Sequence, residues 1–237
     1  MKLAPAATLA CLMSLSVFAL SRLPAADTAE EGFRPLFNGH DLSGWVQRGG
    51  KAKYTVEGDE IVGHTVPNTE NSFLCTDRDY DDFVLELDFK VAPTLNSGVQ
   101  IRSHVYDKET TTEIAAVKGK KAKTKKLPAG RVHGYQCEID PSDRAWTAGI
   151  YDEARRGWLN TLENNEAARK AFKQNEWNHL RIECDGDSIK TWLNGVPAAD
   201  LRDSMTPSGF IALQVHQVGD RTEPLEVRWR NVRIKEL

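Results

Sequence analysis

Three short segments of the chain share one alternating pattern of apolar and polar positions. Residues 99–104, 135–140 and 211–216 place mostly apolar side chains at odd positions and mostly polar ones at even positions. Successive side chains of a β-strand point to opposite faces, so the pattern predicts three strands that bury their odd positions. The polar side chains that then face outward are Gln100, Arg102, His104, Gln136, Glu138, Asp140, Gln214 and His216.

This outward set differs from an ordinary solvated face, which is richer in Lys, Thr and Ser. It combines acids, amides, imidazoles and a guanidinium, which are the groups that hold a polar ligand and move protons. We therefore expect the three strands to bring these side chains together on the hollow side of one curved sheet. The alternative is three unrelated solvated strand faces.

Other segments of the chain also predict strands. A hairpin is expected around Gly58-Asp59, and two more turns at Asp185-Gly186-Asp187 and Asn194-Gly195 separate further strand patterns. Residues 83–90 alternate cleanly, and 225–235 close the set. One helix is expected over residues 162–172. Many short strands with frequent turns favour an all-β jelly roll, a β-sandwich of two antiparallel sheets with one short helix.

The chain shows no internal repeat and no second domain. Residues 107–130 interrupt the strand pattern and contain a Lys-rich run at 118–126. We interpret this segment as a surface loop inserted between two strands. Its positive charge could attract acidic glycans, but a solvated loop is the favoured interpretation.

The N-terminus resembles a secretory signal peptide over residues 1–26. Lys2 precedes an apolar run at 9–20, and Ala25-Ala26 offers small residues for cleavage. A retained membrane anchor is disfavoured by the Ala, Ser and Thr content of the run and by Pro5, and lipidation at Cys11 because this residue lies too early. We expect an exported protein, periplasmic or extracellular, without a stable membrane anchor.

Charge and cysteine content narrow the possible partners. Removal of residues 1–26 takes away Lys2 and Arg22, which leaves 29 basic against 34 acidic residues and a net charge of −5. This balance argues against a nucleic-acid partner. The three remaining cysteines are an odd number without zinc-site spacing, and we expect buried thiols, with a single disulfide as the alternative: Cys75, Cys137 and Cys184.

Several ordered motifs resemble a known bacterial family of exported proteins, the 3-keto-disaccharide hydrolases. They include LFNGHDLSGW at 36–45 and the segments at 96–102, 134–140, 176–182, 192–195, 209–216 and 229–235. The resemblance covers residues 33–237, one domain, and implies a concanavalin A-like jelly-roll fold. It also implies cleavage of glycosides that carry a ketone at C3. The ketone acidifies the hydrogen on C2, and its removal by a base gives an enolate that expels the glycosidic oxygen from C1.

Such chemistry needs a base, a group that stabilises the enolate oxygen and an acid for the leaving group. The catalytic candidates are Glu138, Asp140, His216 and Arg102. The substrate-binding candidates are Gln100, Gln136, Gln214, His104, Trp146 and Tyr151. A divalent cation held by Glu138, Asp140 and His216 could replace Arg102 as the electrophile. Each candidate also has a structural interpretation: Glu138 and Arg102 as a cross-strand ion pair, the histidines as structural or surface residues, and the aromatic rings as core.

Two other functions remain open on the same fold. Retaining glucanases resemble Glu-x-Asp-x-x-Glu, but residues 138–143 end in Asp143 and contain Pro141. A carbohydrate-binding module without catalysis is the second, because fold does not fix function. In every case the expected partner is a carbohydrate, and the sequence leaves the glycoside and the oligomeric state open.

Overall fold

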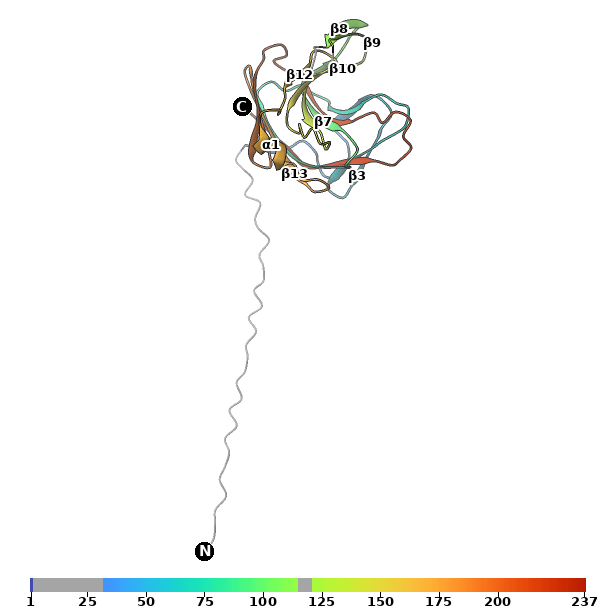
Figure 1. Cartoon of the computed structure of the whole chain (residues 1–237). Helices are drawn as coiled ribbons and strands as arrows, with labels where there is room; N and C mark the ends of the chain where they lie inside the picture. Colours follow the sequence, from blue (N-terminus) through green and yellow to red (C-terminus); the bar gives the residue numbers. More distant parts are fainter. Residues whose placement is uncertain (2–31, 115–120) are drawn as a thin grey trace. The chain divides into compact units, whose positions relative to one another are not determined.

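The structure, a computed structural model, describes Met1 and residues 32–114 and 121–237. The signal peptide expected over residues 1–26 lies outside the described residues apart from Met1, and it stays a prediction. From Gly32 onward the described chain packs as one compact unit of two antiparallel sheets (Figure 1). The prediction of an all-β jelly-roll sandwich with one short helix is confirmed.

Two large sheets form the sandwich, and we name them sheet A and sheet B. Sheet A runs in the order β15 (Val196–Arg202), β14 (Ser188–Leu193), β13 (Asn178–Asp185), β6 (Phe83–Val91), β17 (Glu226–Glu236), β4 (Glu60–His64) and β3 (Lys53–Glu57), with β1 (Arg34–Pro35) paired to β17. Sheet B runs in the order β12 (Gly157–Asn160), β11 (Ile150–Glu153), β10 (Val132–Ile139), β7 (Ser97–Val105), β16 (Phe210–Val215), β5 (Ser72–Thr76) and β2 (Trp45–Gly49). The three alternating segments of the sequence therefore become neighbours in the middle of sheet B.

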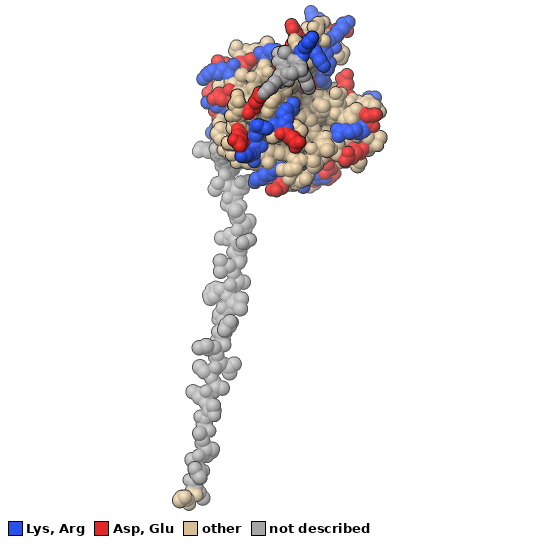
Figure 2. Space-filling view, viewed as in Figure 1, with Lys and Arg blue, Asp and Glu red and all other residues tan. Residues whose placement is uncertain are grey.

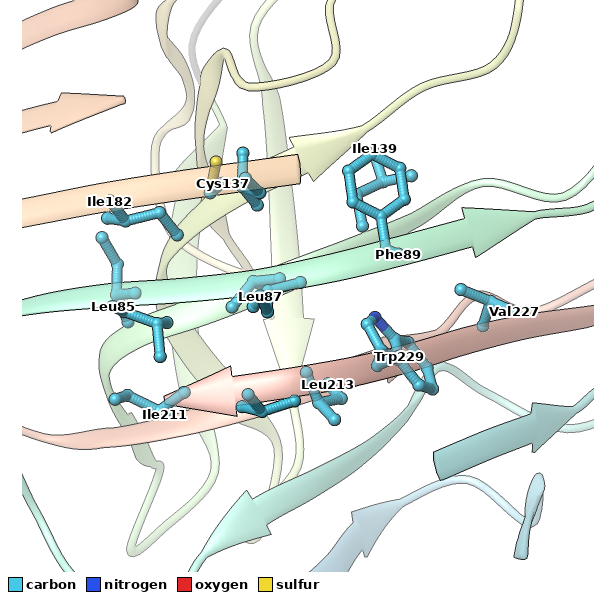
Figure 3. Close-up of a cluster of buried hydrophobic side chains, with 14 of the residues drawn as sticks. Leu85, Leu87, Phe89, Cys137, Ile139, Ile182, Ile211, Leu213, Val227 and Trp229 are labelled. Atoms are coloured by element: carbon cyan, nitrogen blue, oxygen red, sulfur yellow. The ribbon is translucent and has the colours of Figure 1, made fainter. Parts of the chain in front are cut away.

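The core lies between the sheets and is built by strand alternation. Leu85, Leu87 and Phe89 of β6 meet side chains of β10 and β16, and Trp229 of β17 is fully buried among them (Figure 3). Burying one such side chain stabilises the fold by about 1.5 to 3 kcal/mol, and the set fixes which face of each strand is internal. The opposite face of sheet B is thereby free to carry polar groups.

A β-bulge in β7 interrupts this alternation at Arg102. Two residues of β7 lie opposite one residue of each neighbour: the register moves from Gln100 to Ser103 against β16 and from Ile101 to His104 against β10. Arg102 has a φ of 44°. At Gly209, a Cβ atom would come within 2.5 Å of the Arg102 carbonyl carbon, so the bulge requires glycine there. After the bulge Ser103, not Arg102, shares the face of Gln100.

The expectation that Arg102 shares a face with Glu138 is therefore wrong. The Arg102 side chain is fully buried and points toward sheet A. It donates to the Asp81 and Gly186 carbonyl oxygens at 2.6 and 2.7 Å and to the Asp82 carboxylate at 2.7 Å. Arg102 thus joins two turns of sheet A to the bulge.

Two further segments differ from the sequence prediction. The helix α1 (Glu166–Ala171) is shorter than expected because Asn165 caps its N-terminus, accepting from the Ala168 N–H at 3.1 Å. The described parts of the Lys-rich insertion form a hairpin of β8 (Thr110–Ile114) and β9 (Lys123–Leu127) rather than a loop. Lys123, Lys125 and Lys126 of β9 are exposed, and this part of the surface carries both basic and acidic side chains (Figure 2).

Cys75, Cys137 and Cys184 are buried free thiols, as expected. Among the described residues, no helix combines the length and the apolar character that a membrane span requires.

Candidate functional site

A pocket of about 640 Å³ opens on the face of sheet B that is turned away from the core. Its floor comes from β10 through Gln136 and Glu138, and one wall comes from Tyr151 of β11 and Trp158 of β12. Lys125 of the β8–β9 hairpin reaches its rim. The pocket therefore combines the middle strands of the sheet with the inserted hairpin.

Glu138 lies on the pocket floor with 5% of its surface exposed. One carboxylate oxygen, Oε1, accepts from the Asn96 side-chain amide at 2.7 Å, and the other, Oε2, accepts from the Gln136 amide at 2.7 Å. Burial raises the pKa of Glu138 to about 7, against the opposing effect of these two donors and of the nearby Arg144. A carboxyl group of this kind is matched to proton abstraction near neutral pH.

A chain of amides supports Glu138 from within the sheet. Gln136 Oε1 accepts from Gln100 Nε2 at 2.6 Å and from Gln214 Nε2 at 2.9 Å. Gln100 Oε1 in turn accepts from the Ser103 hydroxyl at 2.8 Å. Gln100 and Gln214 are fully buried, so they lie beneath the pocket rather than in it.

A glycine in β7, Gly98, leaves room for this arrangement. A Cβ atom on Gly98 would lie 2.6 Å from the Cγ and Cδ atoms of Gln136, so only glycine allows the Gln136 side chain to lie across β7. Asn96, just before β7, then reaches Glu138. Asn96 and Gly98, which belong to the motif at 96–102, are thus part of the site.

Arg144 supplies a cation on the opposite side of Glu138. Its Nη2 lies 3.6 Å from Glu138 Oε1, and its side chain is 41% exposed. The guanidinium carbon packs 4.9 and 4.8 Å from the ring centres of Trp146 and Trp158. These two rings fix the plane of the guanidinium, which leaves one edge available to a ligand.

Asp140 shares the face of Glu138, as alternation predicts, but its carboxylate is already occupied. It accepts from Arg144 Nε at 2.7 Å, from the Ser142 hydroxyl at 2.6 Å and from the Trp146 N–H at 3.3 Å. Asp140 therefore shapes the loop after β10 and holds Arg144 in place.

The far side of the pocket contains an ion pair between Arg131 and Glu153. Both side chains are about 90% buried. Tyr151 lies beside them on β11, and its ring packs 5.2 Å from that of Trp158. Burial and nearby acids raise the pKa of Tyr151 to about 12, so its hydroxyl remains a hydrogen-bond donor at neutral pH.

His216 stands at the end of β16 and lines the same pocket. Its Nδ1 lies 2.8 Å from the Gln217 carbonyl oxygen. A carbonyl oxygen only accepts, so Nδ1 carries the hydrogen and Nε2 is left to exchange a proton with a ligand.

The structure thus brings together five of the predicted site residues, Gln136, Glu138, Asp140, Tyr151 and His216. Five others do not line the pocket. Gln100 and Gln214 lie beneath it, Arg102 points to sheet A, and Trp146 packs behind Arg144. His104 lies beyond the bulge with Nε2 2.8 Å from the Ser208 carbonyl oxygen.

The sequence also leaves open a divalent cation held by Glu138, Asp140 and His216. Within residues 32–114 and 121–237, no three His, Cys, Asp or Glu side chains come together as a metal-ligand group. The Asp140 oxygens are committed to Arg144 and Ser142. The described residues therefore do not fit this ion.

Solved structures of low sequence identity share the fold. A candidate glycosyl hydrolase from Parabacteroides distasonis superposes with a TM-score of 0.54 at 20% identity, over 87% of this chain and 94% of its own. A Bacillus subtilis protein of unknown function with a galectin-like fold gives 0.54 at 11% identity, over 86% and 94%. A structure from work on endo-acting O-glycanases of the human gut microbiota gives 0.53 at 12%, over 86% and 98%.

A search of curated protein sequences finds no match. A family profile described as a 3-keto-alpha-glucoside-1,2-lyase-like domain matches residues 32–235, most of the described chain. This match confirms the resemblance stated from the sequence motifs and indicates a carbohydrate-related function. The chain belongs to the family of 3-keto-alpha-glucoside-1,2-lyase-like domains.

Proposed function

We propose that this protein cleaves glycosides oxidised to a ketone at C3, by removal of the C2 proton and elimination of the C1 oxygen. The observation that carries the proposal is Glu138, a nearly buried carboxyl group on the pocket floor whose pKa is raised to about 7. At neutral pH a large share of this group is ionised and poised to accept a proton. The two other acids that line the pocket, Asp140 and Glu153, are each paired with an arginine.

Glu138 takes the proton from C2, and the C–H electron pair forms the enolate of the C3 ketone. Arg144 is suited to stabilise the enolate oxygen, because its fixed cation lies beside Glu138 and one edge is exposed. It takes the role that the sequence assigns to Arg102.

The enolate then re-forms the ketone and breaks the C1–O bond. The departing oxygen takes its proton from the imidazolium form of His216, whose Nε2–H is available while its Nδ1–H donates to the Gln217 carbonyl oxygen. The immediate product is an enone with a C1=C2 double bond, to which water can add afterwards. Gln136 stays outside the chemistry as a donor to Glu138.

The two alternative functions have less support in the pocket geometry. A retaining glycosidase needs a second free carboxylate near the first. Asp143 is exposed and does not line the pocket, and Asp140 is occupied by Arg144 and Ser142. A binding module without catalysis would not require a buried carboxyl group that titrates near neutrality.

The decisive experiment compares 3-keto-trehalose and a 3-keto-β-glucoside with their unoxidised parents in D₂O. We expect release of the leaving group from the keto sugars alone, with loss of the C2 hydrogen in the enone and solvent deuterium at C2 only after water has added. Glu138→Gln should lower turnover by about 10² to 10⁴-fold, the range expected for a lost general base. Glu166→Gln, an exposed acid on α1, is the matched control and should retain full turnover.

Two results would contradict the proposal. Cleavage of the unoxidised parents at equal rates would indicate an ordinary glycosidase. Sugar binding without turnover, retained in Glu138→Gln, would indicate a binding module.

A further inference from the structure

The amides beneath Glu138 form a chain with a single direction. Ser103 donates to Gln100, Gln100 and Gln214 both donate to Gln136, and Gln136 donates to Glu138. Gln136 Oε1 has two lone pairs, and the two buried donors occupy both. Rotating the Gln136 amide by 180° would break both hydrogen bonds. Its NH₂ group would then face the NH₂ groups of Gln100 and Gln214.

Gln214 carries a second, independent sign that its donor matters. Its Oε1 is buried and has no hydrogen-bond partner among the described residues. An unpaired buried acceptor is unfavourable for folding, and an apolar side chain of similar length would avoid it. A glutamine at this place therefore contributes through its N–H, which points at Gln136.

We propose that Gln100 and Gln214 are positioning residues, which lock the Gln136 side chain so that its N–H always faces Glu138. This inference rests on the proposed role of Glu138 as the base. It replaces the substrate-binding role that the sequence assigns to Gln100 and Gln214, since neither reaches the pocket.

The physical effect follows from polarisation along the chain. Each donor to Gln136 Oε1 makes the Gln136 N–H a stronger donor, by roughly 10 to 30% per bond. A stronger donor favours the ionised form of Glu138 against its burial. Besides Arg144 and Asp140, which lie closest, the titratable groups that face Glu138 across the pocket are Lys125, Arg131, Tyr151, Glu153 and His216.

The test measures the titration of Glu138 directly, without substrate. In protein labelled with ¹³C at the glutamate carboxyl, the Glu138 signal is assigned by its loss in Glu138→Gln. We expect Gln214→Met and Gln100→Met each to raise the pKa of Glu138 by roughly half a unit, and the double variant to raise it further. In keto-glycoside cleavage, kcat/KM of each single variant should fall about threefold at pH 6 and stay near the original value at pH 9.

Thermal stability distinguishes the positioning role of Gln100 and Gln214 from a purely structural role. Gln214→Met removes the unpaired Oε1, so its Tm should stay unchanged or rise. The matched control is Thr76→Val on the neighbouring strand β5. It removes the hydrogen bond that Thr76 donates to the Arg78 carbonyl oxygen and the one that it accepts from the Ile211 N–H, without changing the amides. It should lower the Tm and leave the Glu138 titration unchanged. If a methionine variant fails to fold, Gln214→Asn, which keeps the amide but withdraws it, should give the same titration shift.

An unchanged Glu138 titration in the Gln100 and Gln214 variants would overturn the inference, as would a loss of kcat/KM that is uniform with pH. Failure of the proposed function is a separate result. In that case the titration shifts as expected, but the original protein leaves keto-glycosides intact.

Discussion

Glu138 is held between opposing influences on its pKa. Burial has the largest effect and raises the pKa, while Asn96, Gln136 and Arg144 lower it and Asp140 raises it slightly. Full desolvation without donors would keep the group protonated and useless as a base, and full solvation would make it too weak a base. The pocket therefore reaches a pKa of about 7 by pairing strong burial with two amide donors and one partly exposed arginine.

This balance predicts a dependence of stability on pH. The folded pKa of about 7 lies above the ordinary value of 4.5, so the folded state binds the proton more tightly than the unfolded state. The contribution to stability is fully present below pH 4.5 and is lost as the pH rises through 7. Between pH 5 and 8 the loss is about 2 to 3 kcal/mol of unfolding free energy.

Urea denaturation at several pH values checks this prediction. The unfolding free energy of Glu138→Gln, measured relative to the original protein, should rise by that amount between pH 5 and 8. Parallel pH profiles for the two proteins would show that Glu138 does not titrate near neutrality.

The bulge in β7 is the element that decides which side chains enter the pocket. A regular strand would have placed Arg102 on the same face as Glu138, opposite Gly134, but the extra residue turns it toward the Asp81-Asp82 turn and Gly186. Because of the bulge, Arg102 has a structural contact with Asp82, and the arginine next to Glu138 is Arg144 from the loop after β10.

We predict that Arg102→Met destabilises the protein without impairing the chemistry. The change leaves the Asp81 and Gly186 carbonyl oxygens without their buried donor and should lower the unfolding free energy by about 2 to 4 kcal/mol. The kcat per folded molecule should stay unchanged, as active-site titration at 15 °C alongside thermal denaturation would show. Lost turnover at unchanged stability would restore Arg102 to a catalytic role.

Strand alternation predicts the regular part of the site and fails where the backbone departs from it. Gln136 and Glu138 follow a regular stretch of β10, and both reach the pocket as expected. Arg102 does not, because alternation cannot detect an inserted residue. The signal in the sequence is a pair of glycines next to the bulge, Gly134 on β10 and Gly209 just before β16.

Three of the site residues that the sequence analysis missed come from loops and an edge strand. Arg144 lies in a loop, Trp158 lies on the short edge strand β12, and Asn96 immediately precedes β7. No periodicity constrains such positions, so only contacts made after folding assign them to the pocket. Asn96 had one available signal, its place in the family motif at 96–102.

Residues 32–114 and 121–237 combine a two-sheet sandwich with one added hairpin at the mouth of the pocket. The hairpin is anchored at the middle of β8, where the Thr112 hydroxyl donates to the Arg155 carbonyl oxygen at 3.1 Å. Lys125 lines both the main pocket and an adjoining hollow of about 120 Å³. The hairpin is therefore placed to contact the part of a substrate farthest from Glu138.

We predict that Lys125→Ala weakens binding of larger substrates rather than slowing the chemical step. For a keto-disaccharide, KM should rise about 3- to 10-fold with little change in kcat, because the lost contact is equal in the ground and transition states. Lys123→Ala, an exposed lysine on the same strand that lines neither pocket, is the matched control. Equal effects of the two variants, or a fall in kcat alone, would remove the hairpin from substrate recognition.

The three buried free thiols provide a chemical probe of unfolding. Burial raises the pKa of Cys75 and of Cys184 to about 12 and that of Cys137 well above its ordinary value, so the folded state presents almost no reactive thiolate. One of these sulfur atoms lies on the pocket-side face of sheet B and two lie in the core between the sheets. A thiol-modifying reagent would therefore label Cys137 and Cys184 only when the two sheets separate, and the labelling rate of these two thiols would time that event.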